Sequence, residues 1–194
     1  MKRPLTALAL AGLLSLAAAG CSSDSSMPGM DHGSDSTETT AAGADFNDAD
    51  VTFAQAMIPH HEQAVEMAKL AEDRAESQEV LDLAAAIEAA QGPEIEQMTT
   101  WLEDWGRPMG DDMGSMSHDG MMTEDQMTDL EAAAGTEFDA MFLEMMIEHH
   151  EGAIEMAQEE VDKGQNPDAV ALAENIIEAQ KSEITTMQGL LEAS

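Results

Sequence analysis

Cysteine is almost absent from this chain: Cys21 is the only one among 194 residues. A disulfide needs two cysteines, so the packing of the core alone must stabilise the fold. Basic side chains are scarce as well, since 7 lysines and arginines stand against 40 aspartates and glutamates, for a net charge of −33. This charge repels phosphate groups and excludes nucleic acid as a natural partner. It favours cations, although a solvated surface suited to salty surroundings would explain it equally well.

The first 20 residues have the composition of an export signal. Lys2 and Arg3 precede an apolar run over residues 5–19, which is too short for a comfortable transmembrane helix. Small residues then lead into Cys21 in the order Ala-Ala-Gly-Cys, which resembles a bacterial lipobox. We therefore predict a signal peptide over residues 1–20 and a lipidated Cys21 that anchors the exported protein to the outer face of the cytoplasmic membrane in a bacterial cell envelope. An ordinary secretory signal with an incidental cysteine is the alternative.

Residues 21–44 are rich in Ser, Asp, Gly and Thr and contain few large apolar side chains. Such a segment cannot bury enough surface to offset its ordering entropy, so we predict a disordered tether. Residues 45–194 are numerous enough to form one domain with a real core.

An internal repeat runs through this domain. When residues 53–102 are set against residues 142–191, at a constant offset of 89 and without a gap, 20 of the 50 positions are identical. Strong helix formers dominate both copies, and the strand-like alternation of polar and apolar residues is missing. Each copy therefore predicts a helical hairpin.

We expect helices over residues 48–74, 79–104 and 123–162, and a fourth that begins near Pro167. Asn47 or Asp48 suits the start of the first helix, and Gly164 suits the end of the third. Short turns within each pair predict an all-α fold, an antiparallel four-helix bundle built from two repeated hairpins. The boundaries are 45–105 for the first repeat, 106–122 for a methionine-rich linker, and 123–194 for the second repeat.

Helical geometry places a pair of adjacent histidines on the apolar face of each repeat. At about 100° per residue, His60 and His61 fall within the same arc of about 120° as the large apolar side chains. The second helix of each hairpin puts Glu94 or Glu183 on an otherwise apolar face, where a histidine is the obvious partner because an unpaired buried carboxylate is very costly. The predicted inward clusters are His60, His61, Met57, Met67, Glu94 and Met98 in the first repeat, and His149, His150, Met146, Met156, Glu183 and Met187 in the second.

Metal ligation is the leading interpretation of these clusters. Imidazole suits copper, zinc, iron and nickel, whereas the thioether of methionine selects Cu(I). The mixture of His and Met therefore indicates copper, with another transition metal as the alternative. Packing alone also remains open, because methionine is a common filler of cores and a buried histidine is often structural.

Two spacings that metal enzymes use are missing. No glutamate lies three residues before any of the four histidines, as the di-iron carboxylate sites of helical bundles require. The zinc-protease sequence His-Glu-x-x-His is absent as well, because Val65 lies four residues after His61. These absences weaken an oxidase or hydrolase interpretation.

A second group of soft donors lies in the linker, among Gly, Asp and Ser. Methionines in a solvated loop have no core to fill, so we predict that this group collects metal ions. Neutral low complexity is the alternative. The residues of the group are Met109, Met113, Met116, His118, Met121 and Met122.

These motifs resemble the domain of unknown function family 305. Its hallmark, Met-Ile-x-His-His-x-x-Ala-(Ile/Val)-x-Met-Ala, is present at residues 57–68 and again at 146–157. A later Gln-x-x-Glu-Ile-x-x-Met matches residues 91–98 and 180–187. The resemblance covers about residues 45 to 194 and implies a ferritin-like helical bundle, export, and copper binding or copper resistance. The methionine-rich linker is extra and need not be shared by the family.

Together these patterns predict a non-enzymatic, lipid-anchored copper-binding protein that sequesters the ion or hands it over outside the cytoplasmic membrane. The four histidines would be the principal ligands, and Met57, Met67, Met146 and Met156 the soft partners. Glu94 and Glu183 would orient the histidines or bind occasionally. A ferritin-like metal-dependent oxidase, and a structural or interaction module without metal, are the alternatives.

Overall fold

The computed structural model describes residues 45–109 and 120–193, and all regular structure within these ranges is helical. The all-α prediction is therefore confirmed. The predicted signal peptide, Cys21, the tether and the linker residues Met113, Met116 and His118 lie outside the described residues. The helices are α1 (Asp48–Arg74), α2 (Gln78–Asp104), α3 (Glu124–Ala132), α4 (Thr136–Lys163) and α5 (Pro167–Ala193).

The prediction of one continuous third helix is wrong, because the chain breaks between α3 and α4. Gly135 has a φ of 65°, a left-handed conformation that glycine adopts without strain. Its N–H donates to the carbonyl of Arg74 at 2.8 Å. Arg74 also donates from Nε to the carbonyl of Glu131 at 2.8 Å. The short α3 is thereby held against the end of α1.

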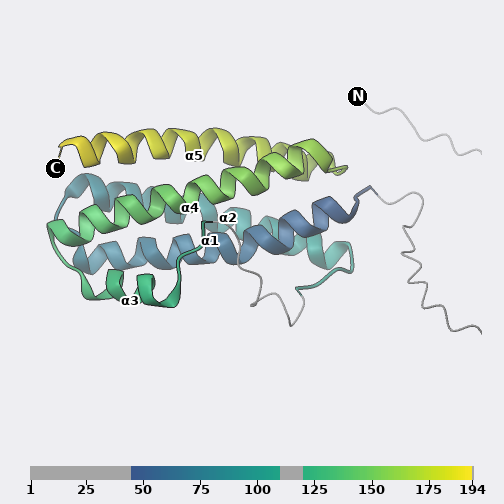
Figure 1. Ribbon diagram of the computed structural model, residues 1–194. Helices are drawn as coiled ribbons and strands as arrows, with labels where there is room; N and C mark the ends of the chain where they lie inside the picture. The colour runs from purple at the N-terminus through teal and green to yellow at the C-terminus, as the bar shows by residue number, and fades with distance from the viewer. Residues whose placement is uncertain (1–44, 110–119, 194) are drawn as a thin grey trace, which may run out of the picture. The chain divides into compact units, whose positions relative to one another are not determined.

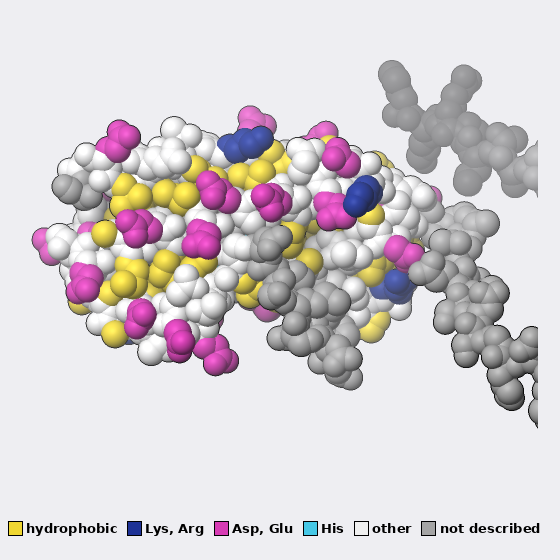
Figure 2. All heavy atoms as spheres, in the orientation of Figure 1, with side chains coloured by type: hydrophobic (Ala, Val, Ile, Leu, Met, Phe, Trp, Pro, Cys, Tyr) yellow, Lys and Arg dark blue, Asp and Glu magenta, His cyan; other side chains and the backbone are white. Residues whose placement is uncertain are grey.

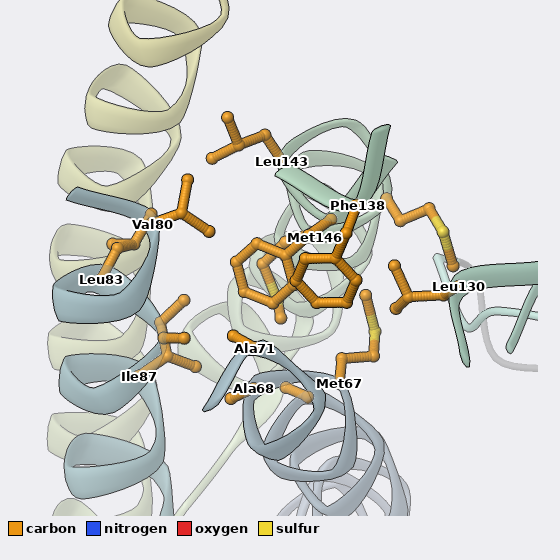
Figure 3. Close-up of a cluster of buried hydrophobic side chains, with 14 of the residues drawn as sticks. Met67, Ala68, Ala71, Val80, Leu83, Ile87, Leu130, Phe138, Leu143 and Met146 are labelled. Atoms are coloured by element: carbon orange, nitrogen blue, oxygen red, sulfur yellow. The ribbon is translucent and has the colours of Figure 1, made fainter. Parts of the chain in front are cut away.

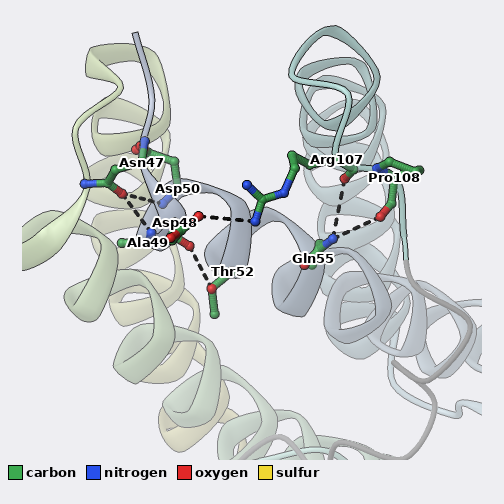
Figure 4. Close-up of polar contacts among 8 residues, drawn as sticks. All are labelled: Asn47, Asp48, Ala49, Asp50, Thr52, Gln55, Arg107 and Pro108. Carbon is green, nitrogen blue, oxygen red and sulfur yellow. Dashed lines mark hydrogen bonds and ion pairs between the residues drawn. The ribbon is translucent and has the colours of Figure 1, made fainter. Parts of the chain in front are cut away.

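Side chains at the helix starts satisfy the free backbone N–H groups there. The Asn47 side chain accepts from the N–H of Asp50, and the Asp50 side chain accepts from the N–H of Asn47, which is a capping box (Figure 4). Thr123 and Gln126 form a second capping box on α3, and Ser77 caps α2. The predicted helix starts are thus explained by local chemistry.

The four long helices form two hairpins, α1–α2 and α4–α5, which meet through α1 and α4 (Figure 1). α1 and α4 are antiparallel, since Asn47 at the start of α1 donates to the carbonyl of Lys163 at the end of α4. α2 and α5 pack mainly against their own hairpin partners. The first helix of each repeat therefore lies at the centre. None of the described helices is both long and apolar enough to span a membrane.

The core consists of two apolar clusters, one on each side of the histidines. One contains the second half of α1 and the first half of α4, where Met67, Leu130 and Phe138 approach one another from α1, α3 and α4 (Figure 3). The other contains the first half of α1 and the second half of α4, with Met57 and Ala153 among its members. Each cluster therefore draws on both repeats. The surface facing the reader in Figure 2 carries acidic side chains between apolar ones.

Two buried aspartates tie each repeat to the other. Asp50 of α1 accepts the N–H groups of Gln165 and Asn166, at 3.0 and 2.8 Å, in the turn between α4 and α5. Asp139 of α4 accepts the N–H groups in the turn between α1 and α2, from Glu76 at 3.1 Å and Ser77 at 2.8 Å. Asp50 and Asp139 are equivalent positions at the repeat offset of 89. The two hairpins are therefore joined by reciprocal hydrogen bonds as well as by their core.

Candidate metal site

All four predicted histidines are fully buried in the structure, at 0 % exposure. They lie at the middle of α1 and α4, where the two central helices cross and the two apolar clusters adjoin. The apolar periodicity of both helices turns the histidines inward, as the helical geometry predicted.

His60 and His149 meet at the contact between the two repeats. Their ring centroids are 3.7 Å apart, and the ring planes are inclined by 40°. Because they are equivalent positions at the repeat offset, each repeat contributes the same side chain to the same place. The structure thus brings the two predicted clusters together at one point, an outcome that the sequence of either repeat alone does not specify.

Each of the other two histidines is held by the glutamate that faces it from the second helix of its hairpin. His61 Nε2 lies 2.7 Å from Glu94 Oε2, and His150 Nε2 lies 2.6 Å from Glu183 Oε2. The glutamates are about one-fifth exposed, at 23 % and 20 % for the side chain. A carboxylate only accepts hydrogen bonds, so the ring nitrogen Nε2 carries the proton. The lone pair of a neutral imidazole is then on Nδ1.

Several buried polar atoms around this point have no hydrogen-bond partner among the described residues. They include Nδ1 of His61 and Nδ1 of His150, which are the nitrogens that carry the lone pair. The amide oxygens of Gln91 and Gln180, one turn before the two glutamates, are also unpartnered and buried. Buried polar atoms are normally hydrogen-bonded. Orphaned lone pairs on imidazole nitrogen therefore suit a cation, and the donor set fits copper.

The electrostatics of the site favour a neutral ring at His149. Burial lowers the pKa of His149 well below its ordinary value of 6.5, and the neighbouring His60, His150 and His61 lower it further. A protonated ring at this position would be a buried positive charge among three other imidazoles. Neutral imidazole is also the form that binds metal ions.

The predicted soft ligands are divided between the two apolar clusters. Met57 and Met98 are fully buried in one cluster, and Met67, Met146 and Met187 are fully buried in the other. Met67 thus lies in the same cluster as two methionines of the second repeat, because α1 and α4 are antiparallel. Met156 is only partly buried and lines a cavity of about 290 Å³ between α1 and α4.

The described linker residues behave in three different ways. Met109 is 40 % exposed, as expected for a solvated loop, whereas Met121 is partly buried. Met122 is only 5 % exposed and belongs to the apolar cluster that contains Met67. The argument that linker methionines have no core to fill is therefore wrong for Met122.

Carboxylates and histidines alone do not complete a metal site. The part of the chain that the structure describes contains no group of three or more His, Cys, Asp or Glu side chains placed to hold a metal ion. An ion at the histidines would need thioether donors or a rotation of one of the rings.

The sequence analysis missed three polar residues that shape the central helices. Asp50 and Asp139 were not identified as equivalent positions, because the comparison of the repeats began at Phe53. The same offset of 89 nevertheless relates them. Gln63, whose side chain binds the backbone of Met122, carries no signal except that its equivalent in the second repeat is Gly152.

These observations define a class of protein. It is an all-helical domain of two repeated hairpins, in which two buried His–Glu pairs lie around a central contact of two histidines. Residues 50–191 match the family described as a domain of unknown function, DUF305. The chain belongs to this DUF305 family.

Solved structures show the same fold. A DUF305 protein from Streptomyces coelicolor, described as secreted, is 35 % identical, with a TM-score of 0.71 over 75 % of this chain and 93 % of that one. A DUF305 fragment from Deinococcus radiodurans is 31 % identical, with a TM-score of 0.70 over 76 % and 98 %. CopM in its Cu(I)-bound form is 32 % identical, with a TM-score of 0.64 over 74 % and 96 %. CopM has also been crystallised in Cu(II)-bound and Ag-bound forms. No curated protein matches the chain.

Proposed function

We propose that this protein binds copper at the point where α1 and α4 cross, and that it sequesters the ion or hands it over outside the cytoplasm. The observation that carries the proposal is the contact between His60 and His149, two fully buried imidazole rings with centroids 3.7 Å apart. Burying the Nδ1 atoms of His61 and His150 is costly unless these atoms gain partners. A bound cation would supply partners for the orphaned lone pairs.

The two glutamates hold two of the histidine rings in a fixed orientation. By accepting from Nε2, Glu94 and Glu183 fix the tautomer and orientation of His61 and His150, leaving Nδ1 as the donor atom. Carboxylates that orient a ligating imidazole in this way also increase its basicity. We therefore assign the four histidines the role of principal ligands, and the glutamates the role of orienting them or binding occasionally.

Thioether donors complete the proposal. Met57 and Met146 lie three residues before His60 and His149, on the same faces of α1 and α4. Met67, Met98, Met156 and Met187 remain further candidates for soft ligands. The crystals of CopM with Cu(I), Cu(II) and Ag support a site that takes soft monovalent ions as well as Cu(II).

We further propose that the chain is exported, lipidated at Cys21 and tethered through residues 21–44, so that the helical domain stands outside the cytoplasmic membrane. The secreted relative from Streptomyces coelicolor supports export. The two antiparallel hairpins support a ferritin-like four-helix bundle. In this location the acidic surface would concentrate cations, and the linker methionines other than the buried Met122 would collect the ion.

Titration with Cu(I), Cu(II) and Ag(I) against a competing chelator tests the proposal. The paired variant His60→Gln/His149→Gln keeps polar side chains of similar size. We expect its affinity to fall by at least about a hundredfold, since the loss of one residue that only orients a ligand already costs about 10- to 100-fold. Glu62→Gln, a substitution on the exposed side of the same helix, is the matched control. Circular dichroism would establish that both variants fold. Unchanged affinity in a folded paired variant would overturn the proposed site.

A further inference from the structure

The end of the methionine-rich linker is docked on the domain. Residues 120–122, here called the strap, run from Gly120 to Met122 immediately before α3. The side chain of Gln63 on α1 forms two hydrogen bonds with Met122: Nε2 donates to the carbonyl at 2.9 Å, and Oε1 accepts the N–H at 2.7 Å. Because one side chain satisfies both backbone groups, this clamp fixes the register of the strap on α1.

The other end of the strap lies directly on the backbone of α4. A Cβ at Gly120 would come within 2.8 Å of the carbonyl oxygen of Glu148 and 2.9 Å of Cα of Gly152. The φ of Gly120 is 84°, which also favours glycine. Glycine at both 120 and 152 therefore permits a backbone-to-backbone contact that any side chain would prevent.

These two contacts place the strap across α1 and α4 at the level of the histidines. Glu148 and Gly152 bracket His149 and His150, and Gln63 lies three residues after His60. On the helical wheel Gln63 is about 160° from His61, which points to Glu94 on α2. The strap is thus on the side of α1 and α4 that faces away from α2 and α5.

The repeat explains how a single strap fits an arrangement with two equivalent halves. Gln63 and Gly152 occupy the same position in the two repeats. The first repeat supplies the long side chain that holds the strap, and the second supplies the gap that the strap fills. Two glutamines would leave no room on α4, and two glycines would leave nothing to hold the strap on α1.

We propose that the strap, held by the positioning residue Gln63, covers the passage through which a metal ion reaches His60 and His149. The inference rests on the proposed function for the identity of the ion that uses this passage. α2 and α5 occupy the opposite side of the central helices, where the His–Glu pairs are formed. Opening on the strap side would separate neither hairpin and would lift Met122 out of its apolar cluster.

The first test needs no metal. Diethyl pyrocarbonate modifies accessible neutral imidazoles, and peptide mass spectrometry reads each histidine separately. Releasing the strap with Gln63→Ala removes two hydrogen bonds, and we expect modification of His60 and His149 to become about tenfold faster. Gly120→Ala, which unseats the strap from α4, should act in the same direction. Unchanged modification in both variants would overturn the proposal.

Gln55→Ala is the matched control, because Gln55 clamps the other end of the linker. Its Nε2 donates to the carbonyls of Arg107 and Pro108, at 3.4 and 3.0 Å, from the same helix (Figure 4). If general freedom of the linker exposed the histidines, this variant would also accelerate modification. We expect Gln55→Ala to match the wild type, and an equal acceleration would overturn the role of the strap.

The second test follows the transfer of Ag(I) from the loaded protein to an excess of chelator. We expect Gln63→Ala to release the ion about tenfold faster, with the equilibrium affinity changed less than about threefold, because the cover affects entry and exit alike. A release rate equal to the wild type would overturn the passage. If the wild-type protein binds no Ag(I) at the histidines, the proposed function is wrong. The proposal that the strap covers the histidines is tested separately, by the metal-free modification rates.

Discussion

The two repeats share the residues through which each half completes the other, and they differ at positions where one half alone carries a feature. The histidine pair, the facing glutamate and the reciprocal aspartate are identical at the offset of 89. The differences include Gln63 against Gly152, Ala71 against Glu160, and Ala75 against Gly164. Equal residues are needed where the two halves complete one another. Unequal residues appear where the structure needs one feature only, such as a single strap.

Glu160 shows a second difference of this kind. Its side chain is almost fully buried, at 1 % exposure, and it lies beside Asp50. Burial raises the pKa of Glu160 to about 8, and the neighbouring carboxylate of Asp50 contributes further. A Cβ at position 164 would overlap the Glu160 side chain, so Gly164 provides the space. The equivalent position in the first repeat is Ala71, so Asp139 has no such neighbour there.

The largest expected effect comes from removing the reciprocal caps. Asp50→Ala leaves three backbone N–H groups without their acceptor and should cost about 3 kcal/mol of unfolding free energy, whereas Asp139→Ala leaves two and should cost about 2 kcal/mol. Urea denaturation at neutral pH measures both. A cost below about 0.5 kcal/mol for either variant would show that water replaces the carboxylate easily.

Glu160→Gln should remove a pH dependence of stability for which only the second repeat has the corresponding residue. With a folded pKa of about 8 against an ordinary value of 4.5, the native protein holds one more proton than the unfolded chain between these pH values. Wild-type stability therefore falls as pH rises through this window, and a glutamine cannot ionise. At about 1.4 kcal/mol per pH unit, we expect the variant to gain about 2 kcal/mol on the wild type between about pH 4.5 and pH 6, and to gain further as the pH approaches 8.

The exposed neighbour provides the control for this effect. Glu159→Gln changes the same charge one residue away, where the side chain is 64 % exposed. Its stability difference from the wild type should be flat over the same pH range. A Glu160→Gln difference that is equally flat would show that Glu160 does not titrate near pH 8.

The two His–Glu pairs should respond alike. Glu94→Gln and Glu183→Gln each weaken one charge-assisted hydrogen bond to a buried imidazole, and we expect each to cost about 1 kcal/mol of unfolding free energy. Thermal or urea unfolding of the metal-free proteins measures the unfolding free energy of both variants. Costs that differ by more than about 1 kcal/mol would break the equivalence of the repeats at the centre.

The smallest effect is expected at an ion pair that only the first repeat has. Lys69 and Glu88 lie 3.8 Å apart with both side chains largely exposed, whereas the equivalent residues of the second repeat are Gln158 and Ile177. Lys69→Ala should change the unfolding free energy by less than about 0.5 kcal/mol, and added salt should reduce the change further. A larger, salt-independent loss would indicate packing by the lysine stem.

Local and periodic features of the sequence predicted much of this structure. The first helix begins after Asn47 and ends at Arg74 as expected, because the cap and the apolar periodicity agree. The inward direction of His60 and His149 followed from helical spacing alone. The break before Thr136 did not, since the three alanines before Gly135 are strong helix formers and the turn depends on a distant partner, the carbonyl of Arg74.

Contacts between distant segments were the least predictable. The meeting of His60 with His149 depends on the crossing of α1 and α4, which periodicity within one helix does not determine. The clamp of Gln63 on Met122 joins residues 59 positions apart and leaves no trace in composition or spacing. Met122 was expected among the solvated linker residues for the same reason, because its place in the core depends on contacts with distant segments.

The reciprocal aspartates make each hairpin dependent on the other for satisfying its own turn. Such an exchange, in which the same patch of one half binds the same patch of the other, is the pattern of an isologous dimer. The chain is therefore equivalent to two subunits joined covalently by the linker, as expected for duplication and fusion of an ancestral hairpin that paired with a second copy. Within one chain this pairing does not depend on concentration, and the two copies can differ at single positions, as Gln63 and Gly152 do.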